Sequence, residues 1–185
     1  MGAYTRFAAG AAAFGLSLAA WAAPVYRITD LGVLPSHEHS RATDLNEGGQ
    51  VVGDSQRYAG AGGPGERRAF VWSAAAGMID LGLPDGASTM NATGLNDTGE
   101  VVGHYEDPAS RLSRAYRWTA QGGLRLADPA DGAVSLLYDI NAAGQISGAS
   151  RVVDGRVSHA FLWSEEAGLR DLGTLPGERA SFAAA

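Results

Sequence analysis

Acidic side chains and histidines are the residues of this chain that could do chemistry. Paired carboxylates can cleave a glycosidic bond by acting as general acid and general base. Such a pair should stand where similar segments of the chain differ, because one substrate needs one asymmetric site. Asp54, His104 and Ala149 occupy such a position, and Glu106 and Asp107 lie beside it. We expect Asp54, His104, Glu106 and Asp107 to line recognition loops rather than to form a catalytic pair.

The sequence predicts no metal ion, cofactor or catalytic residue. Zinc requires three or four converging ligands, but the four histidines lie in separate segments: His37 and His39 together, then His104 and His159. Calcium takes six to eight oxygen ligands, often from alternating loop positions. Asp44 and Asn46 supply oxygen atoms at two alternate positions, but the next alternate position is Gly48, which has no side-chain oxygen.

The amino-acid composition limits the classes of molecule that this chain can bind and the chemistry that it can perform. The formal net charge is −6, and all 14 basic residues are arginines. An acidic chain without a cluster of cations binds nucleic acids poorly, because binding requires the release of counterions from phosphates. The chain also contains 0 cysteines, which excludes disulfides and thiolate chemistry.

One phrase of nine residues organises the chain, and it occurs at 45–53 (LNEGGQVVG), 95–103 (LNDTGEVVG) and 140–148 (INAAGQISG). It indicates a strand, a tight turn and a second strand. The asparagine can hydrogen-bond the backbone two residues on, and the glycine three residues later suits a positive φ. The turn and core residues of the copies are Asn46, Gly49, Gly53, Trp72, Asn96, Gly99, Gly103, Trp118, Asn141, Gly144, Gly148 and Trp163.

Each copy is followed by two further strands. The third strand carries an aromatic residue and a tryptophan two apart (69–72, 115–118, 160–163), and the fourth follows a glycine turn (78–81, 124–126, 169–172). Such units predict an all-β fold of tandem four-stranded repeats of about 45 residues. We expect propeller-like blades in an incomplete or open propeller, with units at 26–77, 78–123 and 124–168 and a partial fourth repeat at 169–185. A β-solenoid or an open stacked array is the alternative.

The two ends of the chain carry their own signals. Residues 1–22 have the pattern of a secretory signal peptide, with an apolar stretch and a small-x-small cleavage site ending at Ala22. We therefore expect residues 23–185 to form a secreted or cell-surface β-repeat domain without a membrane span. Residues 179–185 resemble the run-up to a fourth turn asparagine, which indicates a chain that stops within a repeat; a natural C-terminus is the alternative.

The combined motifs resemble those of a known family. Asp171-Leu172-Gly173-Thr174-Leu175-Pro176-Gly177 is close to its linker, and His159-Ala160-Phe161 is its name-giving triplet. The other copies read Arg68-Ala69-Phe70 and Arg114-Ala115-Tyr116. On these residues and the Asn-x-x-Gly-x-Val-Val-Gly turn, the chain resembles the HAF-repeat family of extracellular bacterial proteins. The resemblance implies an exported repeat protein and supplies no catalytic residues.

We therefore expect an exported, non-catalytic binding or scaffold module. Its partner would be an extracellular ligand, protein or glycan, contacted by residues 54–67, 104–113 and 149–158, and self-association is a further expectation. The alternative is a propeller-type extracellular glycan hydrolase or lyase, of which this chain would be a fragment. That alternative requires Asp54, Glu106 and Asp107 to converge, so the sequence leaves open whether the protein is an enzyme.

Overall fold

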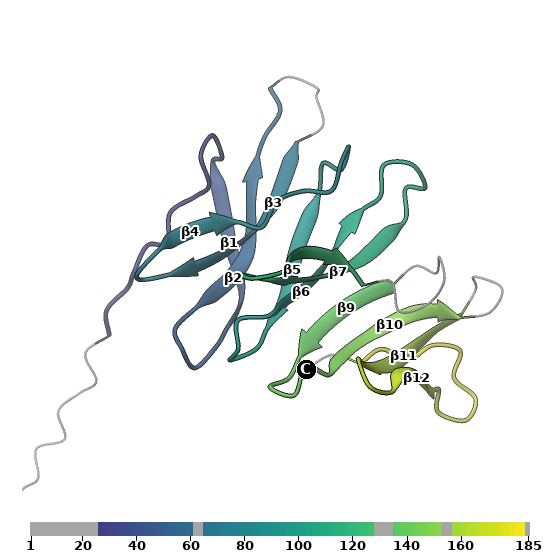
Figure 1. Ribbon diagram of the computed structural model, residues 1–185. Coiled ribbons are helices and arrows are strands. Elements are labelled where there is room, and N and C mark those ends of the chain that lie inside the picture. Colours follow the sequence, from purple (N-terminus) through teal and green to yellow (C-terminus); the bar gives the residue numbers. More distant parts are fainter. Residues whose placement is uncertain (1–25, 61–64, 128–134, 153–156, 184–185) are drawn as a thin grey trace, which may run out of the picture. The chain divides into compact units, whose positions relative to one another are not determined.

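The described part of the chain is an all-β protein. The computed structural model describes residues 26–60, 65–127, 135–152 and 157–183. The chain divides into two units, Met1–Asp30 and Leu31–Ala185, and the second unit holds all the strands described. These residues form three four-stranded antiparallel sheets without a helix (Figure 1). None of them therefore forms a helix that could span a membrane. The predicted signal peptide lies outside the described residues.

Each sheet is a meander in which strands adjacent in sequence are adjacent in the sheet. The first sheet contains β1 (His39–Leu45), β2 (Val51–Arg57), β3 (Glu66–Ser73) and β4 (Gly77–Asp80). The second contains β5 (Met90–Leu95), β6 (Val101–Glu106), β7 (Ser113–Thr119) and β8 (Gly123–Leu126). The third contains β9 (Ser135–Ile140), β10 (Ile146–Val152), β11 (Val157–Ser164) and β12 (Gly168–Gly173). The prediction of tandem four-stranded units is confirmed.

The turn between the first two strands of each sheet is built by its asparagine. The side-chain oxygen of Asn46 accepts the amide of Gln50 at 2.9 Å, and that of Asn141 accepts the amides of Ala143 and Gln145, each at 3.0 Å. The following glycines have positive φ, for example 72° at Gly49, as predicted. The asparagines themselves keep ordinary φ values, so the turn needs their side chains and backbone hydrogen bonds rather than a left-handed conformation.

The first strand of each sheet bulges where it faces a glycine that recurs at the same place in the second strand. The register shifts at Thr43 in β1 and at Thr93 in β5, so that these residues have no direct partner. A Cβ atom on Gly53 would lie 1.9 Å from the carbonyl oxygen of Arg41, and one on Gly103 would lie 2.0 Å from that of Asn91. Only glycine permits this approach, since any side chain would overlap the opposite backbone.

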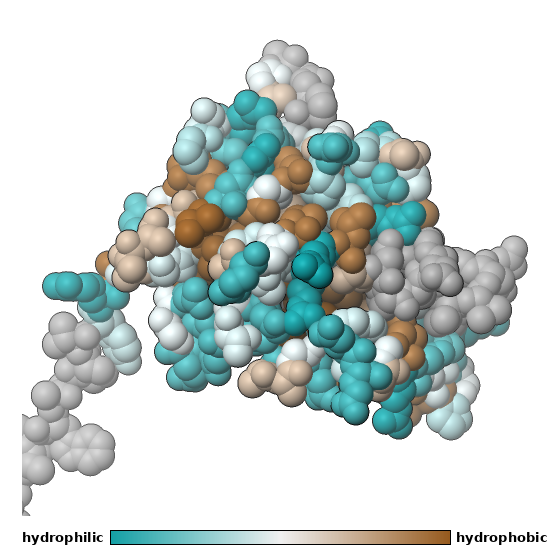
Figure 2. Space-filling view, in the orientation of Figure 1, coloured by the Kyte–Doolittle hydropathy of each residue, from teal (hydrophilic) through white to brown (hydrophobic). Residues whose placement is uncertain are grey.

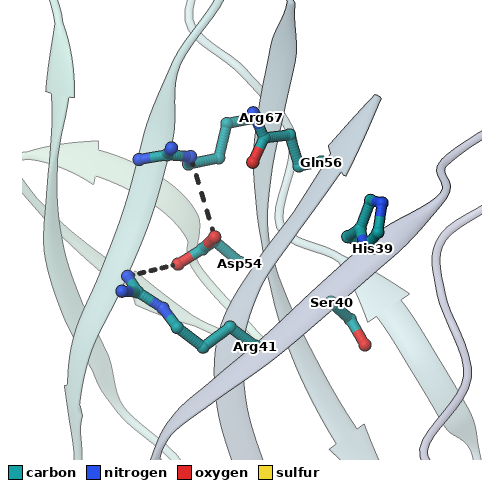
Figure 3. Close-up of a pocket in the computed structure, with 6 residues that line it drawn as sticks. All are labelled: His39, Ser40, Arg41, Asp54, Gln56 and Arg67. Atoms are coloured by element: carbon teal, nitrogen blue, oxygen red, sulfur yellow. Dashed lines mark hydrogen bonds and ion pairs between the residues drawn. The ribbon is translucent and has the colours of Figure 1, made fainter. Parts of the chain in front are cut away.

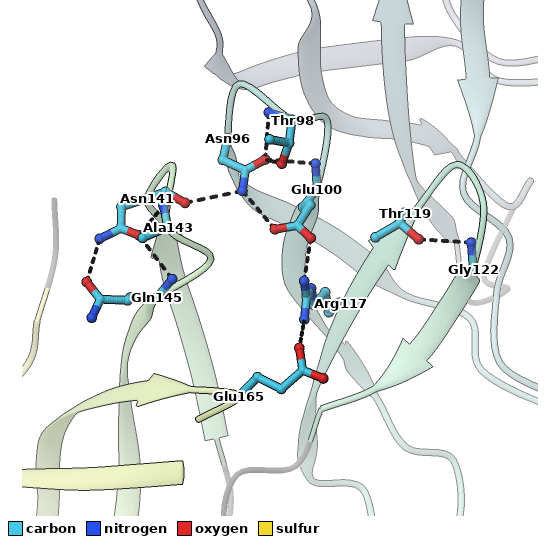
Figure 4. A network of polar contacts seen from close by, with 10 residues as sticks. All are labelled: Asn96, Thr98, Glu100, Arg117, Thr119, Gly122, Asn141, Ala143, Gln145 and Glu165. Atoms are coloured by element: carbon cyan, nitrogen blue, oxygen red, sulfur yellow. Dashed lines mark hydrogen bonds and ion pairs between the residues drawn. The ribbon is translucent and has the colours of Figure 1, made fainter. Parts of the chain in front are cut away.

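Hydrogen bonds join each sheet to the next through these turns and bulges. Asn46 Nδ2 donates to the carbonyl oxygen of Asn96 at 3.0 Å. Figure 4 shows the equivalent bond from Asn96 Nδ2 to the carbonyl oxygen of Asn141, at 3.2 Å. The bulged threonines do the same, since Thr43 Oγ1 donates to the Ala92 carbonyl at 2.9 Å and Thr93 Oγ1 to the Leu137 carbonyl at 2.7 Å. The same polar contacts thus recur at both sheet-to-sheet interfaces.

Apolar side chains fill the two interfaces. One cluster joins residues of the first and second sheets, including Val52, Leu95 and Tyr116, and the other joins the second and third sheets. Leu95 is 5% exposed because it packs against the preceding sheet, whereas Leu45, at the matching place in the first sheet, is 69% exposed. Figure 2 shows further hydrophobic surface over β3 and β4, where Ile79 is 44% exposed.

The segment after the third sheet repeats a contact of the segment before the first. Ser40 Oγ donates to the Gly32 carbonyl at 2.6 Å, and Ser181 Oγ donates to the Gly173 carbonyl at 2.5 Å with the same sequence separation. The Ser181 amide also bonds the Ser158 carbonyl at 2.9 Å. Ser181 therefore holds the segment after β12 against β11 of the third sheet.

We predict that the Asn46→Asp substitution destabilises the protein, whereas Asn141→Asp does not. Both side chains bond a glutamine four residues on, and that glutamine can rotate to donate to aspartate. Asn46 alone also bonds the next sheet and is buried, so its loss places a carboxylate against the carbonyl oxygen of Asn96. We expect Asn46→Asp to lower the free energy of unfolding by about 2 kcal/mol, measured by urea denaturation. Equal losses in the two variants would contradict a stabilising role of the bond between sheets.

Candidate functional site

The position that varies among the three sheets lies in a strand rather than in a loop. Asp54 belongs to β2 and His104 to β6, because pairing with the third strand continues past the glycine. The predicted loops 54–67 and 104–113 are therefore shorter than expected. In the paired strands, Asp54 lies opposite Arg41 and Ala69, His104 opposite Asn91 and Ala115, and Ala149 opposite Leu136 and Ala160. The same row of the sheet thus carries charges in the first sheet, neutral polar groups in the second and apolar residues in the third.

Glu106 and Asp107 form a separate arrangement at the end of β6. Asp107 accepts hydrogen bonds from the Ser110 hydroxyl at 2.5 Å and the Ala109 amide at 3.0 Å, and these bonds hold the pKa of Asp107 below its usual value. Glu106 lies 3.2 Å from the Arg111 guanidinium. These contacts order the turn between β6 and β7.

Asp54 lies in a small pocket between two arginines (Figure 3). Its Oδ1 atom is 2.9 Å from Arg41 Nη2, and its Oδ2 atom is 3.7 Å from Arg67 Nε. His39, Ser40 and Gln56 complete the lining of a cavity of about 140 Å³. The pocket therefore lies where β1 and β3 begin and β2 ends.

The pocket carries an excess of positive charge that solvent can reach. The Asp54 side chain is 7% exposed, while those of Arg41 and Arg67 are 68% and 37% exposed. Two guanidinium groups face one carboxylate, and guanidinium groups remain protonated at any physiological pH. The pocket can thus offer unused N–H donors to an acidic group from outside.

A line of polar contacts runs from this pocket into the second sheet. Arg67 Nη1 donates to Asn91 Oδ1 at 3.1 Å, and Asn91 Nδ2 lies 3.5 Å from His104 Nε2. Burial, and secondarily the charge of Arg67, lower the pKa of His104. Its Nδ1 atom is buried without a hydrogen-bond partner among the described residues. Its surroundings at the interface of the two sheets therefore favour the neutral form of the His104 imidazole.

The structure brings together some predicted residues and adds others. Asp54 and His104 belong to one polar network, whereas Glu106 and Asp107 contact other arginines. Arg67 lies within the predicted contact range 54–67, but Arg41 and Asn91 were missed, although they differ from Leu136 at the matching place in the third sheet. Comparing the residues of the first strand that lie opposite Asp54, His104 and Ala149 would have identified Arg41 and Asn91.

Within the described ranges no group of three or more histidine, aspartate or glutamate side chains is placed to hold a metal ion. Asp44, the residue considered for calcium, accepts the backbone amides of Leu45 at 2.8 Å and of Leu95 at 2.7 Å. Its carboxylate thus ties the first sheet to the second. What the Asp54 pocket offers chemically is recognition of a charged group.

Searches against protein-family models, curated proteins and solved structures gave no match to this chain.

We predict that the protein loses stability as the pH falls from 7.5 to 5, and that His104→Asn reduces this loss. Because the pKa of His104 is lowered in the folded protein, the unfolded chain binds more protons just below the usual pKa of 6.5. The free energy of unfolding should then fall as the pH decreases through this window. Urea denaturation at several pH values measures the effect, and the exposed His39 provides the control variant His39→Asn. An unchanged pH dependence in His104→Asn would refute the interpretation.

Proposed function

We propose that this chain is an exported, non-catalytic β-repeat protein that binds an extracellular ligand. Residues 1–22 support export through their signal-peptide pattern, with cleavage after Ala22. The similarity of the repeated motifs to the HAF-repeat family supports the same localisation, in the secreted fraction or on the cell surface. The ligand is a protein or a glycan.

The three sheets are proposed to be propeller-like blades. Two features support this assignment. Each sheet is a four-stranded antiparallel meander, and β5 and β9, the first strands of the second and third sheets, pack against the preceding sheet and against each other. Blades of this kind bury both faces only by stacking on their neighbours, as the two apolar clusters do here.

One observation carries the proposal of a binding module: the scaffold contacts recur, whereas the Asp54 pocket occurs in one sheet. The asparagine and threonine bonds link each sheet to the next at matching places. At the row of Asp54, by contrast, the sheets carry Asp54, His104 and Ala149. Repeated residues thus serve the fold, and the residues that break the repeat are free to serve a ligand.

The charge of the pocket favours a ligand with an acidic group. Arg41 is 68% exposed and Asp54 neutralises only one of the two arginines. A carboxylate on a sugar or on a peptide side chain can accept two hydrogen bonds from one guanidinium group. The ligand class proposed is therefore an acidic glycan or an acidic peptide segment.

The alternative of a glycan hydrolase lacks such support. Asp54 contacts Arg41 and Arg67, Glu106 contacts Arg111, and Asp107 contacts Ser110. A general acid and a general base would have to face one substrate bond, and these three carboxylates face different partners. Binding without turnover is the function that these contacts favour.

We predict that the full chain binds tetragalacturonate or tetraglutamate at low salt and that Arg41→Gln weakens binding about tenfold, the effect of losing about 1.4 kcal/mol. Isothermal titration calorimetry measures the affinity. Arg125, an exposed residue of β8, gives the matched control, since Arg125→Gln removes the same charge outside the pocket. Equal weakening by both substitutions, or no binding of either probe, would contradict the proposed site.

A further inference from the structure

A second cavity lies at the opposite end of the strands, between the turns of the first and second sheets. It measures about 330 Å³ and none of its lining residues carries a charge. This volume lies at the lower end of the range of small-molecule sites, roughly 300–1,000 Å³. Gln50 precedes β2, whereas Asp54 and Gln56 of the first pocket lie toward the far end of that strand. The two cavities therefore lie at opposite ends of β2.

The floor of this turn-end groove is apolar. Val71 and Ile79 are cross-strand partners and share a face of the first sheet, with exposures of 6% and 44%. Trp118 enters from the second sheet, where it is partly buried and packs against the apolar cluster. The second sheet thus contributes the indole of Trp118, and the first sheet contributes Val71 and Ile79 together with Trp72.

The rim of the groove carries neutral hydrogen-bonding groups. Gln50 accepts a hydrogen bond from Asn46 Nδ2 at 2.9 Å, which fixes its amide beside Gly99 of the second sheet. The Thr98 hydroxyl donates to Asn96 Oδ1 at 2.7 Å, so its oxygen is available as an acceptor. Gln121 is exposed, and its side chain adds another amide on the other side of the groove. Donors and acceptors therefore surround the apolar floor.

The matching groove between the second and third sheets has a different character. Arg117 takes the place of Val71, and Glu165 and Glu166 take the places of Ala120 and Gln121. Arg117 pairs with Glu100 of its own sheet and lies 3.8 Å from Glu165 of the third sheet, so one ion pair crosses this groove (Figure 4). The cavity there is similar, about 290 Å³. The two grooves thus lie at matching places, but the residues that line the first are neutral and those that line the second include charged side chains.

We propose that the neutral groove binds an uncharged carbohydrate. One face of a sugar ring is formed by C–H groups, which pack on an indole and on aliphatic side chains, while the hydroxyls both donate and accept hydrogen bonds. Trp118, Val71 and Ile79 suit the first requirement, and Gln50, Thr98 and Gln121 suit the second. This site goes beyond the proposed recognition of an acidic group, because it uses other residues and another class of ligand.

The test is titration of the full chain with maltohexaose, cellohexaose and N-acetylchitohexaose, followed by tryptophan fluorescence and calorimetry. We expect at least one of these neutral oligosaccharides to bind, with tetragalacturonate excluded from this groove. Trp118→Phe should weaken binding about tenfold, and Trp163→Phe, the change at the matching strand position of the third sheet, should leave it unchanged. Arg41→Gln should also leave it unchanged, which separates this site from the acidic-group pocket.

A second variant avoids the core. Ala120→Glu together with Gln121→Glu introduces the Glu165-Glu166 pattern at exposed positions, so the fold should persist, as thermal unfolding can verify. Loss of neutral-sugar binding in this folded variant supports the proposal. Retention of full binding overturns it, as does failure of all three hexasaccharides to bind the unmodified chain at concentrations of about 10 mM.

Discussion

The structure depends on one hydrogen bond repeated between neighbouring sheets, from a turn asparagine to the turn of the next sheet. The side chain of Asn96 accepts from its own turn and donates to the carbonyl of Asn141 in the third sheet. Local conformation and sheet stacking are thus fixed by the same residue. The Asn141 turn makes the same local hydrogen bonds while exposed, so the bond to the next sheet adds stacking to a turn that is already closed. Where the amide is buried, as at Asn96, losing that bond is costly.

Much of this architecture could be predicted from residue types. The spacing of Asn46, Gly49 and Trp72, repeated twice, sufficed for the four strands of each unit, because turn chemistry and alternating burial are local. The bulge at Thr43 and Thr93 could not be predicted in this way. It depends on the close approach of two strands over Gly53 and Gly103, and on a carbonyl of the following sheet, neither of which leaves a pattern within one strand.

The candidate site was only partly predictable for a related reason. Asp54 and His104 were identified because they differ between copies, but Arg67 and Asn91 join them from β3 and β5. Cross-strand and cross-sheet partners have no fixed sequence separation. Arg117 shows the same difficulty, since its partners Glu100 and Glu165 lie in two different sheets. In such a protein the partners of a charged side chain have to be sought at the interfaces between repeats, and not only within its own repeat.

Gly53 and Asp54 are adjacent in sequence and point to opposite faces of the sheet, as successive strand residues must. The first is constrained by the backbone of Arg41, while the second occupies the row that differs in every sheet. The position that must be glycine and the position that differs between the sheets are therefore neighbours in the sequence. A duplicated repeat can acquire a new surface by changing the second position while the first preserves its foldability, which makes such an array unusually evolvable.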